Sequence, residues 1–383
     1  MPPSNARAEG RQRPLRIGVD ARELLGNRTG VGRYLAALCA EWRALPSLGP
    51  HEFVLFGQAP GDTPAVLGAP FEGEGNGPFR YQTVPGDGGT WWEQTRLAAA
   101  VNASEPDVLF APGYAAPLRA RMPVVVTIHD VSFETHPEWF SWREGMRRRW
   151  LTRRSAQRAA RIVAVSAFTR DEVVTSLGVP RERVSVIWSG LHHVEPPRRV
   201  ERESLVLYVG SIFNRRHVPE LIRAFARVAT TIPDAQLVLV GDNRSHPRQD
   251  LAHLASSAGV AHRVSVRAYV DEAELWSLYG RAAAFVFLSE YEGFGFAPLE
   301  AMAAGVPAIV GDTAVAREIY GDAARLVGVE DVPAIADAIV DVVRNGETRA
   351  RLRNAAARRL PRFTWGRAAA ETLTVLEHAG AVR

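Results

Sequence analysis

Short apolar runs rich in valine and isoleucine alternate with helical patterns along the whole chain of 383 residues. In parallel sheets that are covered by helices on both faces, strands read as continuous apolar runs, and the crossover between strands is a helix. The runs fall into two groups: LRIGVD, EFVLFG, DVLFAP, PVVVTIHD and RIVAVS come first, and LVLYVG, AQLVLVG, RVSVRAYV, AAFVFLS and VPAIVG follow. The sequence therefore predicts an α/β fold built on parallel sheets.

A segment poor in apolar residues separates the two groups. It reads WSGLHHVEPPRRVERES and contains Pro196 and Pro197, which is typical of an interdomain linker. We therefore predict two doubly wound domains, residues 1–190 and 204–364, with a last helix at about 365–383 that returns to the first domain. Ligands of such sheets bind beyond the carboxyl ends of the strands, so the motifs that follow the strands are expected to meet in one interdomain cleft.

The composition excludes several classes of protein. No stretch approaches the roughly 20 apolar residues that span a bilayer, and the N-terminal residues lack the apolar segment of a secretory signal, so we expect a cytoplasmic protein. The single cysteine, Cys39, cannot form an internal disulfide and is predicted to be a buried thiol. All 46 basic residues are arginine, so every role of a permanent positive charge falls to arginine.

Two glycines follow the first predicted strand in the segment NRTGVGRYLAAL. Gly30 and Gly32 precede a predicted amphipathic helix, and glycine there allows backbone amides to approach an anion at the helix N-terminus. A tight turn between strand and helix explains the same residues. The spacing is not that of the dinucleotide-binding motif, so we do not predict NAD binding.

Two polar motifs follow other predicted strands. His129 and Asp130 end the run VVVTIHD, where an imidazole can donate a hydrogen bond or move a proton near neutral pH. A histidine bonded to a local carbonyl is the alternative. Arg215 and Arg216, in YVGSIFNRRHVPEL, precede a helix, and their planar donors suit a diphosphate. An exposed pair on the solvated surface is the alternative.

The segment SEYEGFGFAPLEAMAAGVP covers the end of a predicted strand, a loop and a helix, and two of its three glutamates, Glu292 and Glu300, lie on either side of seven uncharged residues. Glu300 is expected in the first helical turn, where the helix dipole favours a carboxylate, and this would account for it without a ligand. Glu292 and the glycine-rich loop have no such explanation. We expect the amides of Gly295, Phe296 and Ala297 to form an anion site between carboxylates that accept hydrogen bonds from sugar hydroxyls.

The spacing Glu292-x7-Glu300, followed by EAMAAGVP, resembles the family 4 retaining glycosyltransferases, and the resemblance covers nearly the whole chain. It implies the GT-B fold, in which two Rossmann-like domains face a cleft. In this reading Glu292 contacts the donor sugar, and Glu300 binds the ribose. The diphosphate is held by the backbone of Gly293, Phe294, Gly295, Phe296 and Ala297.

The same resemblance implies further roles. Arg215 and Arg216 form the phosphate pair, with arginine where lysine is usual, and His129 lies beside sugar and acceptor. The implied catalytic residues are His129, Glu292 and Arg216, and the remaining implied contacts are Gly30, Gly32 and Ser211 with the donor and Asp130 with the acceptor.

The resemblance also implies a retaining front-face displacement, in which the leaving diphosphate helps to deprotonate the acceptor. No Asp-x-Asp occurs in the sequence, so we expect neither a metal nor another cofactor. The segments TGVGRY, HDVSF and GSIFNRRH are similar to those of bacterial mannosyltransferases of polysaccharide assembly. GDP-mannose is therefore the predicted donor, with UDP-glucose or a UDP-N-acetylhexosamine as alternatives, and the predicted acceptor is a glycan or a lipid-linked glycan.

Two other classes stay open: a GT-B nucleotide-sugar epimerase, which the Glu-x7-Glu spacing disfavours, and a basic binding protein without activity. The arginine-rich segment from Trp139 to Arg161 is interleaved with aromatic residues, which disfavours nucleic acid. We predict that it docks on the anionic inner face of a membrane, making the protein peripheral there, and an ordinary solvated helix face is the alternative. The residues predicted for this contact are Trp142, Arg147, Arg148 and Arg149.

Overall fold

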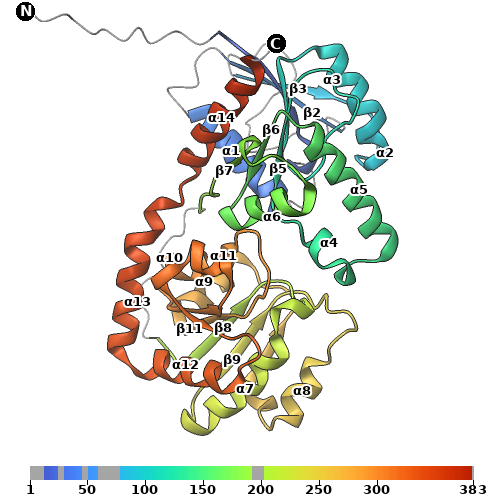
Figure 1. Cartoon of the computed structure of the whole chain (residues 1–383). Helices are drawn as coiled ribbons and strands as arrows, with labels where there is room; N and C mark the ends of the chain where they lie inside the picture. The colour runs from blue at the N-terminus through green and yellow to red at the C-terminus, as the bar shows by residue number, and fades with distance from the viewer. Residues whose placement is uncertain (1–12, 25–29, 45–50, 59–77, 192–201, 382–383) are drawn as a thin grey trace, which may run out of the picture. The chain divides into compact units, whose positions relative to one another are not determined.

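The computed structural model describes residues 13–24, 30–44, 51–58, 78–191 and 202–381. Two parallel sheets, each flanked by helices, make up the described chain (Figure 1). This confirms the predicted α/β doubly wound fold. Most of the predicted linker, residues 192–201, lies outside the described residues.

The first sheet has seven strands in the order β3-β2-β1-β4-β5-β6-β7. Its strands are β1 Arg16–Asp20, β2 Glu52–Gly57, β3 Phe79–Thr83, β4 Val108–Ala111, β5 Val124–Ile128, β6 Arg161–Ala164 and β7 Val184–Val186. The helices of this part of the chain are α1 Gly30–Ala44, α2 Thr90–Trp92, α3 Ala98–Ser104, α4 Ser132–Thr135, α5 Trp142–Arg158 and α6 Ala167–Leu177.

The second sheet has six strands in the order β10-β9-β8-β11-β12-β13. Its strands are β8 Leu205–Val209, β9 Gln236–Val240, β10 Val264–Arg267, β11 Ala282–Phe287, β12 Ala308–Gly311 and β13 Ala324–Val327. The helices that follow are α7 Val218–Thr231, α8 Leu251–Ser257, α9 Glu272–Arg281, α10 Phe296–Ala303, α11 Ala314–Ile319, α12 Val332–Arg344, α13 Gly346–Arg359 and α14 Trp365–Ala381.

The strand order of the second sheet reverses between its first strand, β8, and its fourth, β11. These two strands pair in parallel, so the loops that follow them leave the sheet side by side at its carboxyl edge. Such a switch point is where doubly wound sheets bind ligands. The arginine pair follows β8 and Glu292 follows β11, so the topology brings these two motifs to the same place.

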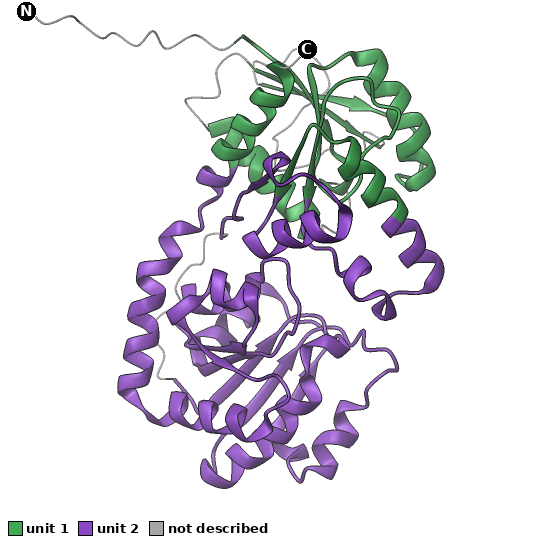
Figure 2. Cartoon of the chain, in the orientation of Figure 1, with its two compact units in different colours: residues 1–127, 150–163, 369–383 green, residues 128–149, 164–368 purple. Residues whose placement is uncertain are grey.

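The chain divides into two compact units (Figure 2). Unit 1 comprises Met1–Thr127, Trp150–Val163 and Ala369–Arg383, and unit 2 comprises Ile128–Arg149 and Ala164–Ala368. The segment from His129 to Arg149 therefore belongs to the same unit as the second sheet, although it follows a strand of the first. The domain boundaries at residues 190 and 204 stay a prediction.

The apolar runs named in the sequence analysis are all strands. The strands that the runs did not predict are β3, β7 and β13, and each lies at an edge of its sheet.

Cys39 is a free, fully buried thiol in α1, as predicted. Gly30 and Gly32 were expected to precede a helix, which is wrong, because α1 begins at Gly30 and Gly32 is its third residue. No described helix is long and apolar enough to cross a membrane.

The core of unit 2 includes the contact between α7 and α12, which are both amphipathic. Helix α7 buries Ile222, Phe225 and Val228, and α12 buries Ile335 and Ile339. Pro219 in the first turn of α7 suits a helix start, because the missing N–H has no partner there in any case. This packing fixes the start of α7 and hence the loop between β8 and α7.

We predict that Phe225→Ala lowers the free energy of unfolding of unit 2 by about 3–5 kcal/mol, because it leaves a cavity at a fully buried ring. Urea unfolding measures the change. The control is Arg223→Ala on the same helix, whose exposed side chain pairs with Glu220 and contributes about 1 kcal/mol or less. Equal losses in the two variants would contradict the assignment of Phe225 to the core.

Candidate active site

The loops after β8 and β11 contact each other through backbone and side chains. The amide of Glu290 donates to the carbonyl of Arg215 at 3.0 Å. Arg216 then reaches across to Glu292, with its Nη2 3.0 Å and its Nε 3.2 Å from Oε1 of that carboxylate. The structure therefore joins the two predicted motifs directly, in one charge pair at the switch point.

Arg216 is held from several sides. Its Nη1 donates to the carbonyl of Ser211 at 2.8 Å, and its guanidinium lies 4.8 Å from the ring centre of Phe287 and 5.6 Å from that of Phe213. Burial lowers the pKa of Arg216, but the interactions with Glu292 and Tyr208 together outweigh burial and leave this pKa above the ordinary value. The guanidinium is thus a fixed, permanently charged group.

Gly210 makes room for this guanidinium. Its φ is +144°, a conformation that L-residues rarely adopt, and a Cβ placed on it would lie 2.7 Å from Nη1 of Arg216. A side chain at this position would therefore meet both backbone strain and the arginine.

Glu292 uses only part of its carboxylate within the protein. Among the described residues, its hydrogen bonds all end on Oε1, where Arg216 donates twice and the hydroxyl of Ser289 donates at 2.8 Å. The other oxygen, Oε2, keeps its capacity to accept hydrogen bonds from hydroxyl groups of a ligand.

Arg215 contacts two aromatic rings. Its guanidinium carbon lies 4.4 Å from the ring centre of Phe213 and 5.1 Å from that of Trp139. Its Nε is buried and has no hydrogen-bond partner among the described residues. Trp139 in turn stacks on His136, with ring centres 4.0 Å apart. The rings fix Arg215 through cation–π contacts and leave Nε to donate to an anion.

The helix α10 starts beside this pair. Gly295 precedes it with a φ of +85° and gives no side-chain cap, and Phe296 is its first residue. The expectation that Glu300 lies in the first turn is wrong, because Glu300 is the fifth residue of α10 and the first turn contains no acidic residue. Helix capping therefore does not explain Glu300. Its charge instead adds to the burial that raises the pKa of Tyr279 well above the usual value.

The segment that begins at His129 lies against the Glu292 loop. A Cβ on Gly293 would lie 1.6 Å from the carbonyl oxygen of His129, so only glycine allows this approach. The hydroxyl of Thr169 lies 3.5 Å from that oxygen and 3.3 Å from the carbonyl oxygen of Gly293. The carboxylate of Asp130 accepts from the amide and the hydroxyl of Ser132. His129 is thus held next to Glu292 through the backbone.

Two family models match consecutive parts of the chain. The model described as Glycosyltransferase Family 4 matches residues 28–194, and the model described as Glycosyl transferases group 1 matches residues 193–359. The chain is a family 4 glycosyltransferase. The models confirm the family that the Glu-x7-Glu spacing predicted.

Relatives with assigned names agree with this family. The O-antigen chain mannosyltransferase RfbU of Salmonella typhimurium is 26% identical over 61% of this glycosyltransferase and 64% of its own length. The O-antigen chain mannosyltransferase B of Escherichia coli is 24% identical over 73% of this chain and 76% of its own. The matched part thus spans just under two thirds of RfbU.

A solved structure gives the fold. HepE of Anabaena, in complex with UDP and glucose, is 20% identical, with a TM-score of 0.71 over 94% of this glycosyltransferase and 100% of HepE. This likeness confirms the GT-B fold.

The other residues predicted for the donor site are divided between the two units. Gly30 and Gly32 are in α1 of unit 1, whereas Ser211 and the segment from Gly293 to Ala297 are in unit 2 with the charge pair. The residues predicted for a membrane contact, Trp142, Arg147, Arg148 and Arg149, are all on α5.

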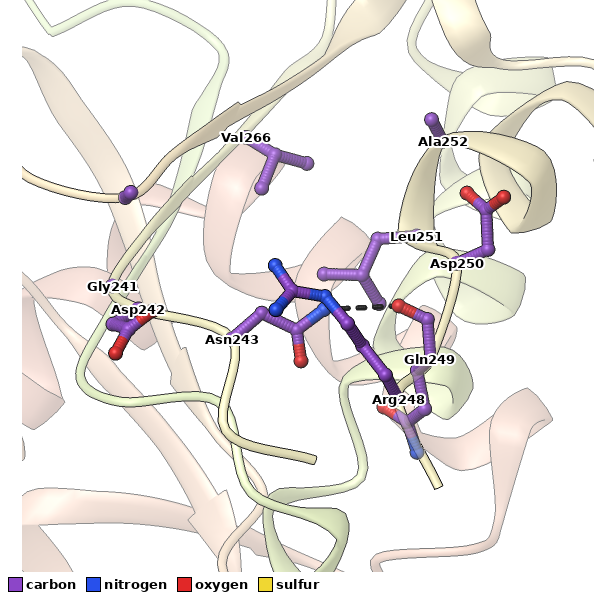
Figure 3. Close-up of a pocket in the computed structure, with 10 residues that line it drawn as sticks. Gly241, Asp242, Asn243, Arg248, Gln249, Asp250, Leu251, Ala252 and Val266 are labelled. Atoms are coloured by element: carbon purple, nitrogen blue, oxygen red, sulfur yellow. Dashed lines mark hydrogen bonds between the residues drawn. The ribbon is translucent and has the colours of Figure 1, made fainter. Parts of the chain in front are cut away.

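A pocket of about 480 Å³ opens at the carboxyl ends of β9 and β10 (Figure 3). Its polar lining includes Asp242, Asn243, Arg248 and Gln249, and the amide nitrogen of Asn243 donates to the carbonyl of Gln249 at 2.9 Å. Asp250, at the start of α8, lies on its rim and caps that helix through Oδ1. This pocket was not predicted from the sequence, although the Gly-Asp-Asn that follows β9 was a signal for it.

Several partners of the predicted residues were also missed. Tyr291 precedes Glu292 directly, and this position was its only signal in the sequence. Phe213 and Glu172 gave none, and Trp139 was expected only as part of the arginine-rich segment, although its ring contacts Arg215; all three reach the site through the tertiary fold. In the part of the chain that the structure describes, no group of three or more His, Cys, Asp or Glu side chains is arranged to hold a metal ion.

We predict that Gly210→Ala destabilises the glycosyltransferase by more than the about 1–3 kcal/mol expected for backbone strain alone, because the methyl group also displaces Arg216. Thermal and urea unfolding measure the loss. Gly178→Ala is the matched control, since Gly178 has a φ of +68° and nothing within 4 Å of an added Cβ. Equal losses would show that Gly210 is not needed to accommodate Arg216.

Proposed function

We propose that this glycosyltransferase transfers a hexose from a nucleotide-sugar to a glycan or lipid-linked acceptor, with retention of configuration and without a metal ion. The observation that carries the proposal is the charge pair of Arg216 and Glu292 at the switch point, beside an uncapped helix start and a second arginine. Such a site combines cations for a diphosphate with a carboxylate for a sugar.

The leaving group is the first requirement of the reaction. As the bond between the anomeric carbon and the diphosphate breaks, negative charge grows on the phosphate oxygens. Arg215, Arg216 and the first amides of α10 stabilise this charge, and because they are already in place they need no reorganisation. Arginine thereby fills the role that a metal ion has in glycosyltransferases with an Asp-x-Asp motif.

The acceptor attacks from the face that the diphosphate leaves. Its hydroxyl oxygen forms the new bond to the anomeric carbon, and its proton moves to an oxygen of the departing diphosphate. Glu292 holds the sugar by accepting from its hydroxyl groups through Oε2, while Arg216 and Ser289 fix Oε1. His129 provides a further polar contact beside the sugar, and Glu300 binds the ribose.

GDP-mannose is the proposed donor, and mannose is the proposed transferred sugar. The names of RfbU and of the Escherichia coli mannosyltransferase support the sugar, whereas the UDP in the HepE complex supports the uridine alternatives. The pocket that residues from Gly241 to Ala268 line lies at the carboxyl edge of the same sheet and suits the base of the nucleotide. Guanine presents two adjacent N–H groups, which a carboxylate such as that of Asp250 accepts.

A thermal-shift screen with GDP, UDP and their sugars tests the donor. A ligand at a hundred times its dissociation constant adds about 2.7 kcal/mol of stability. We expect GDP and GDP-mannose to give the largest shifts in melting temperature. Transfer of the sugar to an acceptor is expected to persist in EDTA. Loss of transfer in EDTA would refute the metal-independent reaction, and isomerisation of the donor sugar without transfer would identify an epimerase.

The two glutamates are predicted to differ in effect. Glu292→Gln should abolish most transfer and leave binding of the nucleoside diphosphate nearly intact, because its ligand is the sugar. Glu300→Gln should weaken nucleotide binding, because its ligand is the ribose. Calorimetric titration and initial rates separate the two effects. A Glu300→Gln variant with unchanged nucleotide affinity would remove Glu300 from the donor site.

We further propose that the acceptor is presented at an anionic membrane surface, to which α5 docks. Trp142, Met146 and Trp150 recur at helical spacing on one face of α5 and are 71%, 45% and 58% exposed. By the same spacing Arg143 and Arg147 flank this stripe on one side and Arg149 and Arg153 on the other. Exposed aromatic residues between arginines suit a lipid interface. Arg148 lies off the stripe and pairs with Glu144 at 2.7 Å.

Sedimentation with vesicles tests this contact. We predict salt-sensitive binding to anionic vesicles and none to neutral ones. The triple variant Arg143→Gln, Arg147→Gln and Arg149→Gln should bind about a hundredfold more weakly, since each arginine contributes about 1 kcal/mol. Arg148→Gln is the control, with nearly unchanged binding. If neither vesicle type binds the wild-type protein, a soluble acceptor is the better explanation.

A further inference from the structure

We propose that Tyr291 is a positioning residue, whose hydroxyl ties the loop that carries Glu292 to the segment that carries His129. The inference rests on the proposed function, because it concerns how the sugar carboxylate is set relative to the residue beside the sugar. It assigns Tyr291 no contact with substrate.

The hydroxyl of Tyr291 makes two hydrogen bonds to distant parts of unit 2. It donates to Oε2 of Glu172 on α6, and it accepts from the amide of Val131 at 3.2 Å. Val131 lies two residues after His129, and Tyr291 lies one residue before Glu292. One oxygen atom therefore joins the two chain segments within two residues of each implied catalytic side chain.

The ring of Tyr291 is enclosed. The residue is 5% exposed, and its ring meets those of His136, Trp139 and Phe168 edge to face, with centres 5.3, 5.8 and 5.6 Å away. Edge-to-face contacts of this kind fix ring orientation. The hydroxyl is thereby directed to its two partners and does not depend on them for its burial.

The partner carboxylate is set to accept this bond. Burial raises the pKa of Glu172, and the hydrogen bond from Tyr291 opposes that rise, as does the charge on His136, whereas Asp130 adds to it. A half-buried carboxylate that loses its donor would be left without compensation, which is unfavourable. The hydrogen bond therefore stabilises both Glu172 and the position of the Tyr291 hydroxyl.

The tie acts where small displacements matter. Gly293 lies in close contact with the carbonyl of His129, so the two segments have no space to adjust once the hydroxyl is fixed. Arg216, which follows β8, and Ser289, which follows β11, orient the carboxylate of Glu292, and Tyr291 fixes the Glu292 loop relative to His129. Loss of the hydroxyl would leave both segments folded but free to shift against each other.

The test is Tyr291→Phe, which keeps the ring and removes the hydroxyl. We expect kcat to fall about tenfold to a hundredfold, as a misplacement of about 1 Å can cause, while KM for the donor changes little. Glu172→Ala should give the same loss, and Glu172→Gln should restore most of it, because its amide oxygen still accepts the bond. Tyr81 lies in the edge strand β3, and its hydroxyl donates to the carbonyl of Gln58; Tyr81→Phe, which removes this hydroxyl, is the control with unchanged kcat.

A second measurement needs no turnover. Hydrogen exchange of the Val131 amide in the substrate-free protein should become at least about tenfold faster in Tyr291→Phe and in Glu172→Ala, as its partner is lost or loosened. If the wild-type protein transfers no sugar, the proposed function fails, and exchange alone still decides whether the tie exists. Unchanged exchange, or a lower melting temperature with unchanged kcat, would overturn the inference. Should Tyr291→Phe not fold, Glu172→Ala tests the same hydrogen bond with the tyrosine present.

Discussion

The charge pair between Arg216 and Glu292 is the interaction on which the arrangement of the active-site loops depends. A guanidinium that is taken out of water and cannot lose its proton must be matched by a carboxylate and by carbonyl oxygens, since a buried charge without a partner costs several kcal/mol. The carbonyl of Ser211 and the carboxylate of Glu292 supply this match. Gly210 is needed because the guanidinium occupies the volume of its missing side chain.

The fold could be predicted for those segments in which burial alone determines the pattern of residues. The central strands are covered on both faces and therefore appear as unbroken apolar runs, such as β11, all of whose residues are buried. The strands that escaped prediction are edge strands, which face solvent on one side or are very short. β3 reads FRYQT, with one buried residue, and β7 has three residues. For such strands the pairing with a neighbour, which the sequence does not display, decides the structure.

The site was predictable to the extent that its groups follow strands in a regular way. Arg216 and Glu292 could be expected together because β8 and β11 are neighbours in any sheet of this strand order. Their supporting groups could not, since Tyr291 and Glu172 are 119 residues apart and are joined only by the tertiary fold. The turn of α10 that contains Glu300 was misplaced for a local reason, because the helix begins directly after Gly295, at Phe296, and Glu300 is its fifth residue.

The solitary thiol in α1 determines how the protein can be studied by chemical labelling. Cys39 is the only cysteine in the sequence and is fully buried, and burial raises its pKa, so little thiolate forms near neutral pH. Alkylating dyes and spin labels should therefore react very little with the native protein. A single cysteine introduced on the surface of each unit would carry a reporter pair without a background signal, and distances between the two units could then be followed during a catalytic cycle.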